Sequence, residues 1–176
     1  MDLVKEVSLG ANVPNEINVV IEIPRGSANK FEVDKETGLI KLDRVIHAAM
    51  FSPADYGFLP QTHWHDGDPL DALVFTTYPL YPGVLVEARP IGVAYMIDSG
   101  EKDEKILAVA IGDPRFKEVK DISDLPTHTV DEIKHYYDHY KILQGKTVHV
   151  SGFGGAEEAK KIIKEGQELY KEKFER

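Results

Sequence analysis

The stretch Asp66-Gly67-Asp68-Pro69-Leu70-Asp71-Ala72 places three carboxylates within six residues. Pro69 disfavours a helical backbone at the preceding residue, so we expect Asp68 to be extended. In an extended segment Asp66 and Asp68 point to the same side, about 6.6 Å apart. Pro69 also has a fixed φ and can begin a turn that brings Asp71 back toward the other two. Converging carboxylates repel one another, so the stretch predicts a site for a hard divalent cation such as Mg²⁺ or Ca²⁺.

Two other interpretations of this stretch are a plain polar turn and a calcium-binding loop. A plain polar turn is one, because Asp, Gly and Pro are common turn residues. An EF-hand calcium loop is the other, but its sixth position would be Asp71 instead of glycine and its twelfth Thr77 instead of glutamate. Aromatic segments precede the stretch at 56–58 and 63–65, and the apolar run 73–75 follows it. We therefore expect the acids to be partly enclosed, and enclosed carboxylates need partners.

Composition narrows the class of protein. With 176 residues, 42% of them hydrophobic and 29% charged, the chain is expected to form one globular domain over 1–176. The net charge of −9 argues against a nucleic-acid partner, which would require a basic patch. No cysteine is present, which excludes disulfides and thiolate metal sites. No apolar run approaches 18 residues and the amino terminus lacks an apolar signal-type segment, so we expect a cytoplasmic protein with no membrane partner.

The hydrophobic pattern predicts many short strands and a few helices. Strands are expected over residues 17–23, 30–34, 39–45, 84–97, 106–111 and 146–152. Pro90 should bend or split the long strand. Glu22 is unusual among Val and Ile, and taken alone it favours an edge strand with this side chain facing water. Residues 47–65 resemble an ordered loop, the usual location of functional residues.

Helices are expected mainly toward the carboxyl terminus. A short amphipathic helix is conceivable over 3–10, a capping box at Thr129–Glu132 predicts a helix that Gly145 ends, and a second helix is predicted over 156–173. Short strands followed by helices indicate an α+β fold, with a β-barrel or curled sheet and packed helices. His63 and His65 are weak evidence for a transition metal, and Tyr136 stands where a zinc-protease motif around His135 would need glutamate.

Several spaced motifs together resemble one family. They are Val20-Ile21-Glu22-Ile23-Pro24, Lys30-Phe31-Glu32, Asp43-Arg44, Tyr56-Gly57, Asp66-Gly67-Asp68-Pro69-Leu70-Asp71, Arg89-Pro90-Ile91-Gly92-Val93, Asp98 with Asp103 and Lys105, and His139-Tyr140-Lys141. In this order, over roughly residues 15–165, they are similar to family I soluble inorganic pyrophosphatases of the prokaryotic type. Ser52 and Ser99 depart from the pattern, because family members often have Tyr and Glu there.

The resemblance implies an α+β fold built on a five-stranded OB-like β-barrel with flanking helices. It implies a homo-oligomer, commonly a hexamer in prokaryotes. It also implies Mg²⁺-dependent hydrolysis of inorganic pyrophosphate to two orthophosphates, by in-line attack of a water molecule that the metals activate.

The resemblance assigns roles to charges that are otherwise isolated in the sequence. Asp68 would be the general base. The metal ligands would be Asp66, Asp71, Asp98 and Asp103 with Glu32 nearby, Asp71 being shared by two ions, and Glu22 would support the water network. Phosphate oxygens would be bound by Lys30, Arg44, Tyr56, Lys105, Tyr140 and Lys141.

Three rivals to this interpretation remain at the level of sequence. An OB-like barrel can bind nucleic acid, although the negative charge argues against it. A Ca²⁺-binding structural domain is conceivable but would not need Lys30, Arg44 and Lys141. The closest enzymatic rival is another two-metal phosphohydrolase that acts on nucleotides.

Overall fold

The computed structural model describes residues 2–174. Its elements in chain order are β1 (Ile17–Ile23), β2 (Asn29–Val33), β3 (Ile40–Val45), β4 (Asp55–Phe58), β5 (Asp71–Phe75), β6 (Leu85–Asp98), β7 (Glu101–Lys102), β8 (Lys105–Ala110), the 3₁₀ turns η1 (Pro114–Phe116) and η2 (Ile122–Asp124), helix α1 (Thr127–His139), η3 (Ile142–Gln144), β9 (Val148–Gly155) and helix α2 (Ala156–Phe174).

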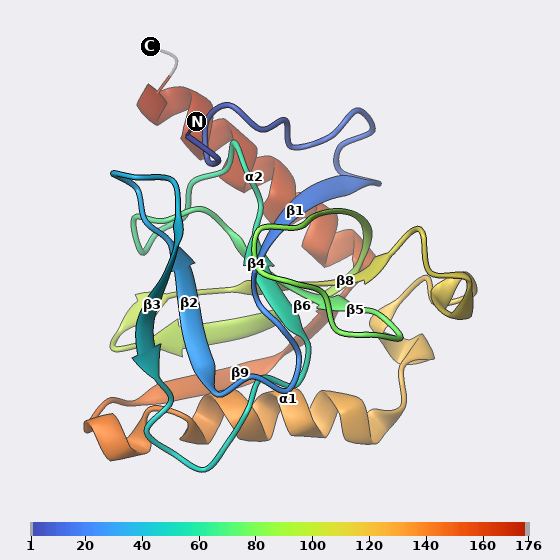
Figure 1. The fold of residues 1–176 in the computed structure, drawn as a ribbon. Coiled ribbons are helices and arrows are strands. Elements are labelled where there is room, and N and C mark those ends of the chain that lie inside the picture. The colour runs from blue at the N-terminus through green and yellow to red at the C-terminus, as the bar shows by residue number, and fades with distance from the viewer. Residues whose placement is uncertain (1, 175–176) are drawn as a thin grey trace.

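Five strands form a ring in the order β1, β4, β5, β8 and β6, with β6 pairing again with β1 (Figure 1). β5 and β8 are parallel, whereas the other neighbours in the ring are antiparallel. β9 pairs with β6 outside this ring, and β2 and β3 form a separate hairpin. The predicted α+β, OB-like arrangement of five strands with flanking helices is confirmed.

Strand β5 is buried on both faces, which explains its uninterrupted apolar sequence. Because side chains alternate along a strand, Ala72 and Val74 join one core cluster while Leu73 and Phe75 join another. Helix α2 packs on the first cluster and helix α1 on the second. The acidic residue that begins β5, Asp71, is therefore held by a strand packed on both sides.

Strand β6 runs for 14 residues without interruption. Its register against β8 shifts between Pro90 and Gly92, so the predicted break at Pro90 is a bend and not a split. A Cβ at Gly92 would lie 2.8 Å from the Gly154 carbonyl oxygen, so the glycine permits β9 to approach the bend. This bend allows one strand to contact both β1 and β8.

Several local predictions were wrong. Helix α1 begins at Thr127 after Pro126, and no side chain caps it. The backbone N–H of Thr129 already donates to the carbonyl of Pro126 at 2.9 Å, so the expected capping box lies inside the helix. Gly145, in a left-handed conformation, ends the separate turn η3 and not α1. Residues 3–6 form only a turn.

Two strand predictions also need correction. The region 47–65 contains strand β4, which the sequence analysis missed; its Gly57 packs on β1, where a Cβ would lie 2.0 Å from the Val20 carbonyl oxygen. Glu22 is 8% exposed on a strand paired with both β4 and β6, so it is not a water-facing edge residue. Over residues 2–174, no helix has the length and apolarity needed to cross a bilayer.

Candidate active site

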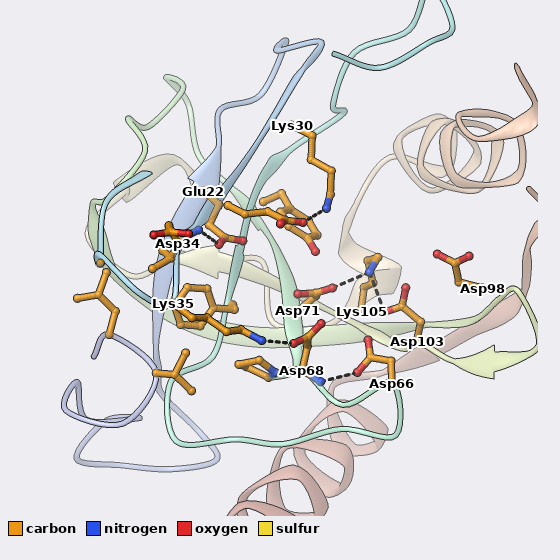
Figure 2. A pocket seen from close by; sticks show the side chains of 18 of the residues that line it. Glu22, Lys30, Asp34, Lys35, Asp66, Asp68, Asp71, Asp98, Asp103 and Lys105 are labelled. Atoms are coloured by element: carbon orange, nitrogen blue, oxygen red, sulfur yellow. Dashed lines mark hydrogen bonds and ion pairs between the residues drawn. The ribbon is translucent and has the colours of Figure 1, made fainter. Parts of the chain in front are cut away.

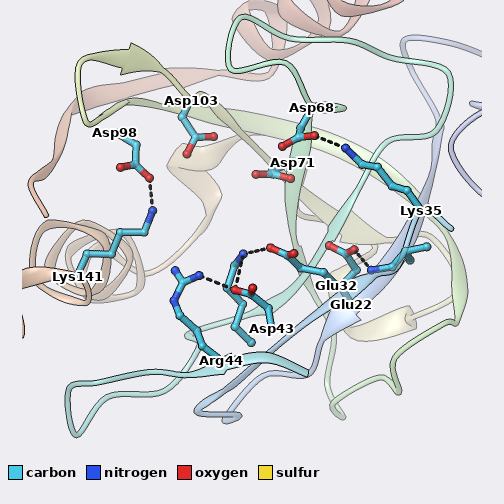
Figure 3. Close-up of polar contacts among 12 residues, drawn as sticks. Glu22, Glu32, Lys35, Asp43, Arg44, Asp68, Asp71, Asp98, Asp103 and Lys141 are labelled. Atoms are coloured by element: carbon cyan, nitrogen blue, oxygen red, sulfur yellow. Dashed lines mark hydrogen bonds and ion pairs between the residues drawn. The ribbon is translucent and has the colours of Figure 1, made fainter. Parts of the chain in front are cut away.

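A pocket of about 280 Å³ lies between the β2–β3 hairpin, the turn before β5, the start of β8 and the end of α1 (Figure 2). Twelve of the thirteen residues proposed from the sequence line it: Glu22, Lys30, Glu32, Tyr56, Asp66, Asp68, Asp71, Asp98, Asp103, Lys105, Tyr140 and Lys141. The thirteenth, Arg44, lies beside it (Figure 3). The fold thus brings together residues that are more than 100 positions apart in the chain.

The acidic stretch that opened the sequence analysis is a turn, not an extended segment. The N–H of Trp64 donates to the Asp68 carbonyl at 2.8 Å, and the N–H of Gly67, whose φ is +94°, donates to the Trp64 carbonyl at 3.1 Å. Asp71 needs no turn after Pro69, because it reaches the pocket as the first residue of β5. The chain therefore turns at Gly67 between the two aspartates that were expected to share one extended segment.

Lys105 organises the inner end of the pocket. Its Nζ lies 2.8 Å from the Asp71 carboxylate and 2.9 Å from that of Asp103, and its side chain is 3% exposed (Figure 2). Burial alone would lower the pKa of Lys105, but Asp103 and Asp71 outweigh it and hold that pKa well above its usual value. Burial raises the pKa of Asp103 to about 6 despite the attraction of Lys105, with the Asp71 charge acting in the same direction as burial.

Glu22 is the most strongly perturbed acid in the pocket. Its carboxylate accepts a hydrogen bond from the Val33 N–H at 2.7 Å. Burial raises its pKa to about 8, and the nearby charges of Asp71 and Glu32 add to this effect. Burial likewise raises the pKa of Asp66. Burial therefore favours the neutral form of these two acids.

Three further cations of the site are paired with acids (Figure 3). Lys141 contacts Asp98; although burial opposes it, this ammonium keeps the pKa of Asp98 below its usual value. Lys30 contacts Glu32. Within the hairpin, the carboxylate of Asp43 lies 3.7 Å from the Nζ of Lys30 on β2 and 2.6 Å from a guanidinium nitrogen of Arg44 on β3. The buried Nε of Arg44 has no hydrogen-bond partner within residues 2–174.

The donor set of the pocket fits Mg²⁺ by its chemistry. Nine carboxylates and four lysines line the pocket, and oxygen is the ligand that Mg²⁺ prefers. No three His, Asp or Glu groups of residues 2–174 converge into a ready-made cage. Figure 3 shows Asp68, Asp71, Asp103 and Asp98 in an arc along one side, opposite Glu32 and Arg44. Burial, reinforced by the neighbouring charge of Asp71, raises the pKa values of Glu22, Asp66 and Asp103, and a bound cation would favour the charged form of such carboxylates.

Sequence reasoning missed some residues of this site. Lys35 lines the pocket, and its Nζ lies 2.7 Å from the Asp68 carboxylate. It follows β2 directly, so no alternation pattern marks it as a site residue. Asp43 was noticed only as part of a motif with Arg44. Asp34 and the amino-terminal residues 2–4 also border the pocket, where the Val4 carbonyl accepts from the N–H of Gln61 at 2.8 Å.

The two departures from the family pattern have different surroundings. Ser52 is buried, and its hydroxyl donates to the Ala54 carbonyl at 2.7 Å. It borders a separate cavity of about 30 Å³ together with Tyr56 and Lys105. Ser99 adopts a φ of +52°, and its hydroxyl donates to the Asp98 carboxylate at 3.0 Å. Ser99 is therefore in direct contact with a residue of the pocket, whereas Ser52 is behind it.

Comparison with known proteins gives one consistent result. The family model described as inorganic pyrophosphatase matches residues 19–171. The chain belongs to the inorganic pyrophosphatase family. An inorganic pyrophosphatase of Geobacillus stearothermophilus is 50% identical over 156 residues, covering 89% of this chain and 94% of that protein. One from Sulfolobus acidocaldarius is 51% identical over 161 residues, covering 90% and 93%.

Solved structures of the inorganic pyrophosphatase family agree with this assignment. The crystal structure of the inorganic pyrophosphatase from Thermus thermophilus has a TM-score of 0.94 at 42% identity, covering 97% of this chain and 99% of that chain. The enzyme from Helicobacter pylori has a TM-score of 0.90 at 41% identity, covering 94% and 99%. As a family member the chain is a hydrolase, and the family supports pyrophosphate as its substrate.

Proposed function

We propose that the pocket hydrolyses inorganic pyrophosphate to two orthophosphates in an Mg²⁺-dependent reaction with in-line attack of water. The observation that carries the proposal is the arrangement of the pocket: an arc of aspartates faces cationic side chains across a space large enough for a small polyanion (Figure 3). Phosphoryl transfer requires mainly positioning and neutralisation of charge. Carboxylates that bind metal ions, together with lysine and arginine side chains that bind phosphate oxygens, would meet both requirements.

The residues divide by the charge that they bind. Asp66, Asp71, Asp98 and Asp103, with Glu32 nearby, would hold Mg²⁺, which supplies charge neutralisation and acidifies water. Lys30, Arg44, Lys105 and Lys141, with the hydroxyl groups of Tyr56 and Tyr140, would bind and orient the phosphate oxygens. Burial keeps both tyrosine pKa values above the usual range, so their hydroxyls remain hydrogen-bond donors at neutral pH. Glu22 would support the water network.

Asp68 would accept the proton of the attacking water. It is the most exposed of the pocket aspartates that were proposed from the sequence, and its side chain is 59% exposed. A positioned general base contributes about 10²–10⁴-fold in rate. Enzymes lower barriers by about 8–23 kcal/mol in total, so most of the acceleration must come from charge neutralisation and orientation by the other groups.

Phosphate release from pyrophosphate tests the proposal. We expect release with Mg²⁺, none with a chelator, and much slower release from ATP or a phosphate monoester, because the pocket has no base-binding or Walker element. Comparable kcat/KM for ATP and pyrophosphate in Mg²⁺ would reassign the protein to nucleotide hydrolysis. Failure to release phosphate from either substrate would contradict the proposal as a whole.

We also propose that residues 1–176 form one domain, and that the protein works in the cytoplasm as a homo-oligomer, a hexamer on the family resemblance. Large apolar side chains exposed on the single chain support self-association, among them Leu39, Phe51 and Tyr81. Light scattering coupled to size-exclusion chromatography measures the number of subunits. A monomer at micromolar concentration would contradict this part of the proposal.

A further inference from the structure

A buried hydrogen bond joins the two segments that carry the pocket aspartates. The indole N–H of Trp64 donates to the carboxylate of Glu104 at 2.6 Å. Trp64 is 4% exposed and Glu104 8% exposed. Neither residue lines the pocket. Over residues 2–174, this is the only hydrogen bond that the Glu104 side chain makes, so the indole of Trp64 is the one hydrogen-bond donor to this buried carboxylate.

Both residues occupy central places in their segments. The backbone of Trp64 closes the turn of Asp66 and Asp68, because it donates to the Asp68 carbonyl and accepts from Gly67. Glu104 stands between Asp103 and Lys105, which both face the pocket. Neighbouring side chains of an extended chain point to opposite sides. Glu104 therefore points inward, where it meets the indole ring.

The strand ladder cannot fix this geometry by itself. The pairing of β5 with β8 begins at Asp71 and Lys105, so it sets the position of Asp71 relative to Asp103. Asp66 and Asp68 come before the first pair of the ladder, in the turn. The bond from Trp64 to Glu104 supplies a second point of attachment on the far side of these aspartates.

We propose that Trp64 and Glu104 are positioning residues, which fix the turn carrying Asp66 and Asp68 against the segment carrying Asp103 and Lys105. The inference rests on the proposed function of those residues. Three of the four phosphate-binding cations, Lys30, Arg44 and Lys141, come from other elements, so loss of the bond should lower kcat more than it raises KM.

Two variants at one position isolate the hydrogen bond. Glu104→Gln and Glu104→Leu both remove the negative charge beside Asp103, but only glutamine keeps an oxygen that can accept from the indole. We expect Glu104→Gln to retain kcat within about threefold, and Glu104→Leu to lose about 10- to 100-fold, the range that misplacement of catalytic groups produces. Trp64→Phe should resemble Glu104→Leu, and the double variant should lose no more than either single variant.

A stability control separates positioning from general weakening of the core. Thr76→Val removes another buried hydrogen bond to a carboxylate, that of Asp55 at 2.8 Å, away from the pocket. We expect it to lower Tm and keep kcat when assayed well below the Tm. Hydrogen exchange gives a readout independent of activity: the amides of Trp64 and Gly67, which close the turn, should exchange faster in Glu104→Leu than in Glu104→Gln or Thr76→Val.

The outcomes are distinguishable. The inference is overturned if Glu104→Leu and Glu104→Gln have equal kcat. It is also overturned if Thr76→Val loses activity in proportion to its loss in Tm. In both cases an active parent protein leaves the proposed function intact. Unchanged exchange of the turn amides in Glu104→Leu also overturns it. A parent protein that releases no phosphate overturns the proposed function and this inference together.

Discussion

The two ends of the pocket contain ion pairs of nearly the same length in opposite surroundings. At the inner end, Lys105 and Asp103 are 2.9 Å apart, with side chains 3% and 13% exposed. At the rim, Lys35 and Asp68 are 2.7 Å apart, with side chains 72% and 59% exposed. Exposed pairs contribute about 0–1 kcal/mol, whereas removal of one partner from a buried pair costs about 3–5 kcal/mol. The inner pair therefore supports the fold, while the rim leaves Asp68 free to do chemistry.

Asp68→Asn should have the largest effect, and it should fall on activity. We expect kcat to drop by about 10²–10⁴-fold, because the amide cannot accept a proton from water. Unfolding by urea should be nearly unchanged, since the carboxylate is exposed. A variant with kcat within threefold of the parent at every pH would remove Asp68 from the role of general base.

Lys105→Met should have the largest effect on stability. It leaves the carboxylates of Asp71 and Asp103 facing each other without a cation, so we expect a loss of about 3–5 kcal/mol in the free energy of unfolding at pH 8, measured in chelator. The loss should be smaller at pH 5, below the pKa of about 6 of Asp103, where protonation relieves the repulsion. An equal loss at both pH values would show that packing, not charge, dominates.

Glu22→Gln should change how stability depends on pH. Burial raises the pKa of Glu22 to about 8 from 4.5. Between these values the folded protein keeps a proton that the unfolded chain has released, so Glu22 lowers stability as pH rises from about 5 to 8, by a few kcal/mol in all. In chelator, the free energy of unfolding of Glu22→Gln should fall less between pH 5 and 8 than that of the parent. The control Glu168→Gln, at an exposed position, should show the same pH dependence as the parent. A variant that declines as steeply as the parent would contradict the burial argument.

Lys35→Met should have the smallest effect on stability. The pair with Asp68 is exposed, so we expect a change below about 1 kcal/mol, which salt should abolish. Lys41→Met is the matched control, because Lys41 is 69% exposed on the same hairpin and pairs with Asp34 at 3.9 Å. A loss above 2 kcal/mol for Lys35→Met alone would mean that the rim supports the fold after all.

The sequence was most informative where a run of apolar residues forms a buried strand. The β-branched run of β1 and the apolar run of β8 predicted strands correctly, because nearly all of their side chains are buried. The apolar run of β5 was not predicted as a strand, since four apolar residues are too short to show a period. Asp66, Asp68 and Asp71 were predicted as a cation site from their own stretch of sequence, and the other residues of the pocket followed from the family resemblance, not from periodicity. The strand pattern around Glu22 favoured a side chain that faces water, whereas the family resemblance assigned it to the site, and the structure buries it there.

The features that could not be predicted depend on contacts between distant parts of the chain. Lys35 and Asp68 are 33 positions apart, and Trp64 and Glu104 are 40 apart; neither pair leaves a periodic mark in the sequence. The turn at Asp66 was weighed as an alternative to an extended segment, and the two backbone hydrogen bonds of Trp64 that close it leave no mark in the sequence. Local rules give propensities, while tertiary contacts decide among conformations of similar energy.

The most direct test of the central claim compares Asp71→Ala with Asp103→Ala across an Mg²⁺ titration of phosphate release. On the proposed function, the inner end of the pocket would position the metals, and Asp71, fixed at the start of β5, would be shared by two of them. We predict that saturating Mg²⁺ restores a larger share of the plateau rate to Asp103→Ala, since concentration restores occupancy but not the spacing that a shared ligand maintains. Full recovery of Asp71→Ala, with none for Asp103→Ala, would contradict the account and exchange the roles of the two aspartates.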